Sequence, residues 1–217
     1  MLVCAATGFA WLVPFALAAH APAPGADPGR ADPRRGAVTF AHRCARCHGA
    51  SAHGDPARAI PALAGQRRAY LVRELASFAA GSRESAAMHR ALTQRTLHDP
   101  RTWADVADYL HDLPPLAHPQ TGSGAHAALG RGIFREQCAS CHGYDARGDA
   151  RGVTPSLRNQ HYAYLAAQMR RMAGGGRHDL DENLERFLRS FDATGIDAVA
   201  DYLSRLTDSR GQPARRH

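Results

Sequence analysis

The apolar positions of this chain recur at the intervals expected of helices. Residues 67–80 and 161–173 carry large apolar side chains every three or four positions, which places those side chains along one side of a helix. A further helix is predicted after Asp99-Pro100, because helices often begin with a capping aspartate followed by proline. No segment alternates between apolar and polar residues as a half-buried strand would. The pattern predicts an all-α fold.

The helical pattern occurs twice, at an offset of 94 residues that becomes 93 in the last helix. Short helices are predicted at 36–43 and 130–137, and the last helix of each half contains Val-Ala-Asp-Tyr-Leu. Self-similarity at a fixed offset indicates an internal duplication. We therefore predict two tandem domains, residues 34–113 and 125–206, each with a thin apolar core. Matching positions include Gly36 and Gly130, Phe40 and Phe134, Pro61 and Pro155, Gln66 and Gln160, Tyr70 and Tyr164, and Arg83 and Arg177.

Three segments fall outside the predicted domains. Residues 114–124 are rich in proline and glycine and lack periodicity, which predicts a short linker. Residues 207–217 form a polar tail. Residues 1–21 are mostly apolar and contain two small-X-small patterns, as expected of an export signal peptide with an uncertain cleavage site. No basic residue precedes the apolar run, and an uncleaved membrane anchor is the alternative.

Cysteine spacing predicts a cofactor. Four of the five cysteines lie in two Cys-X-X-Cys-His motifs, made by Cys44, Cys47 and His48 and by Cys138, Cys141 and His142. Two cysteines at this spacing add to the vinyl groups of a haem, and the histidine that follows binds the iron. The alternatives are a zinc site, a thioredoxin-type redox pair or a disulfide. Zinc would need further ligands, and a redox pair has no use for the histidine. We predict two covalently bound haem c groups.

Charge and composition narrow the class of partner. All 27 basic residues are arginine, and the formal net charge is +7. Such a charge suits an acidic docking partner or a membrane surface. The basic residues form no stripe interleaved with aromatic residues, so we expect no nucleic-acid partner. Because haem is attached to these motifs outside the cytoplasmic membrane, we expect an exported, periplasmic protein.

Longer motifs surround each cysteine pair. Both halves contain Gly-X-X-X-Phe-X-X-X-Cys-X-X-Cys-His-Gly, then Pro-X-Leu-X-X-Gln-X-X-X-Tyr-Leu, then Gly-X-Arg. On these residues, the chain resembles the dihaem class I cytochromes c of the cytochrome c4 type over residues 34–206. The resemblance implies two cytochrome c folds in tandem, in which the first and last helices cross. Gly36 and Gly130 would permit the crossing, with Phe40 against Tyr109 and Phe134 against Tyr202.

The resemblance also implies the histidine ligands of both haems and the sixth ligand of the first. His48 and His142 would each bind iron through one ring nitrogen and donate the other N–H to a carbonyl, that of Pro61 or of Pro155. Met88 lies in the segment that usually supplies a methionine sulfur as the sixth ligand. A soft, neutral ligand of this kind favours ferrous iron and raises the reduction potential.

The second half lacks this methionine. Met88 aligns with Glu182, and no methionine follows Met172. The sixth position of the second iron is therefore open, filled by His178 or Met172, or filled by another group. We expect Met172 to be a wall residue of the haem pocket. His161 is expected at the surface.

These features predict an exported dihaem cytochrome that transfers single electrons. Its donor would be a quinol-oxidising complex or a dehydrogenase, and its acceptor a terminal oxidase or another periplasmic protein. One alternative is a haem enzyme or small-ligand-binding protein that uses an open second haem. Another is a cytochrome subunit of a larger oxidoreductase.

Overall fold

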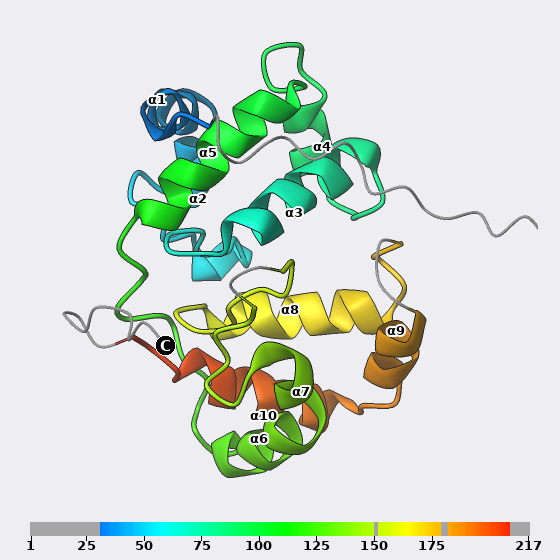
Figure 1. Cartoon of the computed structure of the whole chain (residues 1–217). Coiled ribbons are helices and arrows are strands. Elements are labelled where there is room, and N and C mark those ends of the chain that lie inside the picture. The colour runs from blue at the N-terminus through cyan, green and yellow to red at the C-terminus, as the bar shows by residue number, and fades with distance from the viewer. Residues whose placement is uncertain (1–30, 150–151, 179–181, 209–217) are drawn as a thin grey trace, which may run out of the picture.

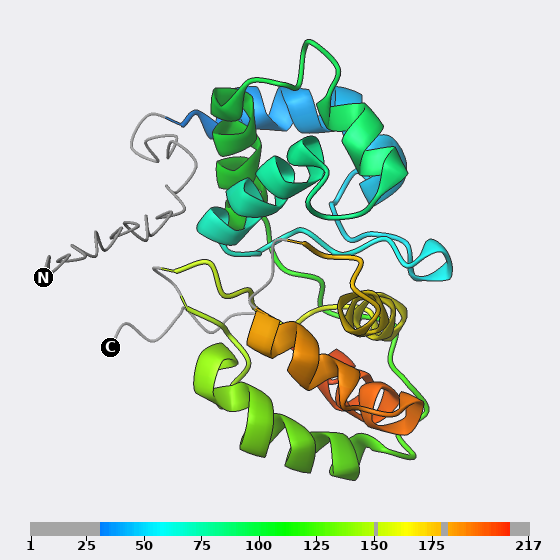
Figure 2. The ribbon, with the colours of Figure 1, turned by 90° about the vertical axis from the view of Figure 1, so that its right-hand side faces the viewer.

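The computed structural model describes residues 31–149, 152–178 and 182–208. The predicted signal peptide and residues 209–217 of the predicted tail lie outside these residues. The described chain is helical and contains no strand, which confirms the all-α prediction. Two helical units follow one another along the chain and pack together, one above the other in Figure 1 and in the turned view of Figure 2.

The first unit contains five α-helices and one short 3-10 turn. They are α1 (Pro33–Arg43), α2 (Ala45–His48), η2 (Pro56–Arg58), α3 (Arg68–Ala80), α4 (Ala86–Leu92) and α5 (Pro100–Asp112). Asp99 caps α5 by accepting a hydrogen bond from the N–H of Arg101, and Pro100 is its first residue, as the sequence predicts.

The second unit repeats the order of the five α-helices. It contains α6 (Ala127–Ile133), the π-helical segment η3 (Phe134–Cys138), α7 (Ala139–His142), α8 (Tyr162–Ala173), α9 (Glu182–Arg189) and α10 (Ala193–Ser204). The predicted helix 130–137 is thus split, because its last turn widens into a π-helix. A wider turn of this kind is uncommon and local. The π-helical segment ends at Cys138, which directly precedes α7.

The first and last helices cross closely in each unit, α1 on α5 and α6 on α10. Gly36 and Gly130 lie at the crossings, and both are buried. Beside each crossing an aromatic pair packs at a centroid distance of 5.6 Å, Phe40 with Tyr109 and Phe134 with Tyr202. Phe40 and Phe134 are almost completely buried, so these pairs belong to the two apolar cores.

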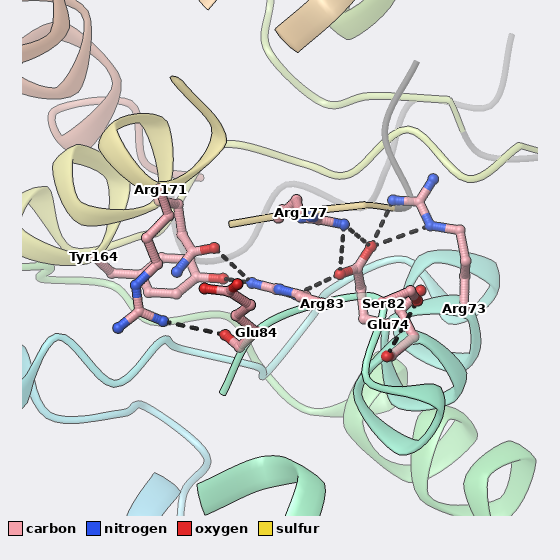
Figure 3. Close-up of polar contacts among 10 residues, drawn as sticks. Arg73, Glu74, Ser82, Arg83, Glu84, Tyr164, Arg171 and Arg177 are labelled. Carbon is pink, nitrogen blue, oxygen red and sulfur yellow. Dashed lines mark hydrogen bonds and ion pairs between the residues drawn. The ribbon is translucent and has the colours of Figure 1, made fainter. Parts of the chain in front are cut away.

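Helices α3 and α8 face one another where the two units meet (Figure 1). Between them lies the carboxylate of Glu74, buried on α3 (Figure 3). Arg83 of the first unit and Arg177 of the second both contact this carboxylate, Arg177 at 2.9 Å. Arg83 also donates to Tyr164 at 2.9 Å and to Gln168 at 2.8 Å. The matching arginines of the two halves therefore converge on one acid.

Backbone contacts reinforce this junction. The N–H of Glu84 donates to the carbonyl of Gly176 at 3.2 Å, and the N–H of His178 donates to the carbonyl of Ser82 at 2.7 Å. The chain segments that carry Arg83 and Arg177 thus run antiparallel beside each other. This pairing fixes the two arginines in register.

His161 does not lie at the surface, and the expectation from sequence was wrong. Its side chain is buried where the units meet. Its Nε2–H donates to the carbonyl of His53 at 2.8 Å, and its Nδ1 accepts from the N–H of Gln120 in the linker at 2.9 Å. A sequence pattern could not show this, because both partners are far from His161 along the chain.

Candidate functional site

Each Cys-X-X-Cys-His motif occupies one helical turn. In the first unit, the carbonyl of Cys44 accepts hydrogen bonds from the N–H of Cys47 at 3.1 Å and of His48 at 3.0 Å. Cys44 is half-buried, Cys47 is exposed and His48 is buried. Two thiols and an imidazole therefore lie on one helical turn, which runs from the surface at Cys47 to the interior at His48.

The second unit repeats this arrangement on α7. Cys138 precedes the helix and is half-buried, Cys141 is exposed, and His142 ends the helix half-buried. The two cysteines and the histidine of each motif thus lie together on one helical turn.

The thiol pKa values argue against a redox pair. Burial is the main cause that raises the pKa of Cys44 to about 11, and it does the same for Cys138. A thioredoxin-type cysteine needs the opposite shift, because the thiolate is the nucleophile. Within the described residues, neither cysteine pair is joined by a disulfide. A structural zinc site needs four Cys or His ligands. In the part of the chain that the structure describes, no group of three or more His, Cys, Asp or Glu side chains lies close enough together to bind a metal ion.

Both histidines are held by a backbone carbonyl. His48 Nδ1 lies 3.3 Å from the carbonyl oxygen of Pro61, and His142 Nδ1 lies 3.3 Å from that of Pro155. A carbonyl only accepts, so each Nδ1 carries the proton and each Nε2 keeps a lone pair. Burial lowers the pKa of both imidazoles, and the hydrogen bond only partly offsets this. Each site therefore presents a neutral, oriented imidazole beside two thiols, which fits covalent haem.

The segment between α3 and α5 carries Met88. It lies half-buried in the first turn of α4, where the hydroxyl of Ser85 caps the helix by accepting from the N–H of Met88 at 3.3 Å. The corresponding helix of the second unit is α9, which begins with Glu182. The role of Met88 as an iron ligand stays a prediction. Sequence analysis did not predict helices α4 and α9, because both are short.

The other candidate ligands of the second iron, His178 and Met172, lie in different environments. His178 is bonded through its backbone to Ser82 of the first unit, and its side chain is 66% exposed and turned toward Glu84. Met172 lies half-buried near the end of α8. Met169, one turn earlier, packs against the core of the second unit.

A sequence profile of the Cytochrome c family matches this chain twice, at residues 33–114 and 127–207. The chain belongs to the cytochrome c family. Each match covers one helical unit with its Cys-X-X-Cys-His motif, so the two units are tandem cytochrome c domains. This cytochrome c carries two covalent haem c groups, at Cys44 and Cys47 and at Cys138 and Cys141, and it is a dihaem electron carrier.

Two relatives are named thiosulfate dehydrogenase electron acceptors. The protein of Thiomonas intermedia is 35% identical over 146 residues, which are 62% of this chain and 64% of the relative. The protein of Stutzerimonas stutzeri is 31% identical over 182 residues, 79% of this chain and 82% of the relative. The chain thus spans slightly less than two thirds of the Thiomonas protein.

Two solved structures share the fold. Reduced cytochrome c4 of Pseudomonas stutzeri superposes with a TM-score of 0.71 at 26% identity, over 81% of this chain and 99% of that one. Thiosulfate dehydrogenase (TsdBA) of Marichromatium purpuratum superposes with a TM-score of 0.69 at 30% identity, over 80% of this chain and 40% of that one. The first match confirms the resemblance to the dihaem cytochromes c4.

Proposed function

We propose that this cytochrome accepts electrons in the periplasm from a dehydrogenase that oxidises a small sulfur compound, thiosulfate in the first instance, and passes them to a terminal oxidase. The observation that supports the carrier role is the pair of matching sites, each with two thiols and a carbonyl-held imidazole. The names of the two relatives support the choice of donor. No helix among the described residues has the length and apolar character needed to cross a bilayer.

In the proposed first site, His48 and Met88 would hold the haem iron. A bound haem supplies a one-electron couple that changes valence without a chemical step on the protein. The protein fixes the imidazole through the Pro61 carbonyl and supplies a soft, neutral sulfur from α4. This ligand set favours the ferrous state and suits an electron acceptor.

In the proposed second site, His142 would be the one ligand that the described residues supply to the haem iron. Three observations support this. The position that matches Met88 is Glu182, no methionine follows Met172 in the sequence, and His178 is tied to the first domain. An open second iron also favours one further candidate function, the binding of a small ligand at that haem. This chain superposes on 40% of the Marichromatium thiosulfate dehydrogenase chain. That match to part of a longer chain supports a third arrangement, in which this cytochrome works as a subunit of a larger oxidoreductase.

Two measurements on the haem-loaded protein test the proposal. Mixed with a purified thiosulfate dehydrogenase and thiosulfate, both haems should become reduced, and omission of the enzyme should leave them oxidised. Persistent oxidation with a competent dehydrogenase would contradict the donor assignment. Carbon monoxide should bind to half of the total haem in the reduced protein, and the His178→Ala variant should bind the same amount. If the unmodified protein binds none, the second iron has a sixth protein ligand.

A further inference from the structure

Gln160 of the second domain reaches the backbone of the first. Its side-chain oxygen accepts from the N–H of Ala62 at 3.0 Å, and its Nε2 donates to the carbonyl of Ala62 at 2.9 Å. Both residues are buried, so neither bond competes with water. Bonds of this kind inside a protein are electrostatically stronger than the same bonds in solvent.

Gln66 makes the reciprocal pair. Its Oε1 accepts from the N–H of Ser156 at 2.9 Å, and its Nε2 donates to the carbonyl of Ser156 at 2.9 Å. Gln66 matches Gln160 and Ala62 matches Ser156 at the offset of 94 residues, so the two pairs are related by the duplication. Each domain therefore extends one glutamine side chain to the backbone of the other domain.

The orientation of both amides is fixed by a second donor. The N–H of His161 donates to Gln160 Oε1 at 3.0 Å, and the N–H of Arg67 donates to Gln66 Oε1 at 2.8 Å. Each side-chain oxygen thus receives two backbone N–H groups, which an amide nitrogen could not accept. The acceptor faces the other domain in both cases.

Each glutamine bonds the peptide group that holds an iron-binding histidine. The N–H of Ala62 and the carbonyl of Pro61 belong to one peptide unit, and that carbonyl accepts from His48 Nδ1 at 3.3 Å. The N–H of Ser156 and the carbonyl of Pro155 form the equivalent unit, which accepts from His142 Nδ1 at 3.3 Å. A hydrogen bond on the N–H side polarises the amide and makes its carbonyl a better acceptor.

We infer that Gln66 and Gln160 are crossed positioning residues, each of which tunes the haem of the opposite domain. Gln160 strengthens the acceptor of His48, and Gln66 strengthens the acceptor of His142. A stronger acceptor makes the imidazole a more basic ligand, which stabilises ferric iron and lowers the reduction potential of that haem. This inference rests on the proposed ligation of iron by His48 and His142.

The test is redox titration of two matched variants of the haem-loaded protein, with each haem assigned by its paramagnetically shifted proton signals. In Gln160→Leu, the reduction equilibrium of the first haem should shift about threefold toward the ferrous form, or roughly 30 mV for one electron, and the second haem should stay unchanged. In Gln66→Leu, the second haem should shift and the first should not.

Gln168→Leu is the control. This interface glutamine bonds Arg83 at 2.8 Å and contacts neither proline peptide, so it should move neither potential. A shift in the haem of the same domain, equal shifts of both haems, or no shift in either glutamine variant would overturn the inference. A failure of the proposed iron ligation is distinguishable from a failure of this inference. If His48 and His142 do not bind iron, His48→Ala and His142→Ala will leave the spectrum of the corresponding haem unchanged.

A second measurement uses the unmodified protein, in case a variant fails to fold. The amide protons of Ala62 and Ser156 should exchange with solvent at least about a hundredfold more slowly than those of an exposed loop. Exchange at the rate of a free peptide at either position would show that the crossed bond is absent and would overturn the inference.

Discussion

Gly36 lies against the backbone of Asp105 where α1 crosses α5. A β-carbon at position 36 would stand 2.0 Å from the carbonyl oxygen of Asp105, well inside contact distance. Gly130 has the same relationship to Ala198, whose carbonyl oxygen would be 1.8 Å away. Because the obstacle is backbone in both cases, no side-chain rearrangement relieves it, and the helices cross this closely only with glycine.

We predict that Gly36→Ala forces α1 and α5 apart and lowers the free energy of unfolding by at least about 2 kcal/mol. Denaturant unfolding followed by circular dichroism measures this. Gly132→Ala is the control, since a β-carbon there meets nothing within 4 Å. It should stabilise α6 by about 0.5–1 kcal/mol through helix propensity. Equal effects of the two variants would contradict the close crossing.

A second prediction concerns the acid shared by the two domains. Glu74→Ala removes the carboxylate that Arg83 and Arg177 both contact, and it should lower the free energy of unfolding by about 3–5 kcal/mol. Arg73→Ala removes a partner of the same carboxylate whose side chain is 35% exposed, so its effect should stay below about 1 kcal/mol. Thermal or denaturant unfolding of both variants gives the comparison. If Glu74→Ala is no more damaging than Arg73→Ala, the ion cluster is not a main support of the junction.

A third prediction tests the proposed sixth ligand of the first haem. Met88→Leu keeps an apolar side chain of similar volume on α4 and removes the sulfur. Carbon monoxide bound by the reduced protein should rise from about one to about two molecules per chain, because the first iron also becomes accessible. Met172→Leu is the matched control and should leave the stoichiometry unchanged. An unchanged titration for Met88→Leu would show that the sulfur does not bind iron.

A fourth prediction separates the two haem sites. Replacing both Cys138 and Cys141 with alanine should reduce the mass of the mature protein by one haem, and the first haem should keep its spectrum. The reciprocal variant at Cys44 and Cys47 should lose the other haem. Mass spectrometry of the denatured protein reads this directly, because only a covalent haem survives denaturation. Retention of two haems in either double variant would place the attachment elsewhere.

Local patterns in the sequence were sufficient for the elements of each domain. Asp99 and Pro100 start α5 because capping and the missing N–H of proline act within one turn. The Cys-X-X-Cys-His spacing dictates a single turn with two thiols and an imidazole on it. The duplication was visible because both halves keep the same residues at an offset of 94, which becomes 93 in the last helix.

The split of the helix 130–137 and the short helices α4 and α9 were not foreseen. All three depend on short-range geometry that periodicity over a few residues does not resolve.

The sequence by itself thus determined the helical class and the two haem attachment sites, and the resemblance of its motifs predicted the close crossing at Gly36. Only the tertiary structure decided the contents of the domain junction. There His161 is buried, and Arg83 and Arg177 both contact Glu74. Gln66 and Gln160 each bond the backbone of the opposite domain. The physical reason is the distance along the chain. These polar side chains look solvated in a local pattern, and their partners lie 90 residues or more away in several cases, so only docking of the two domains pairs them.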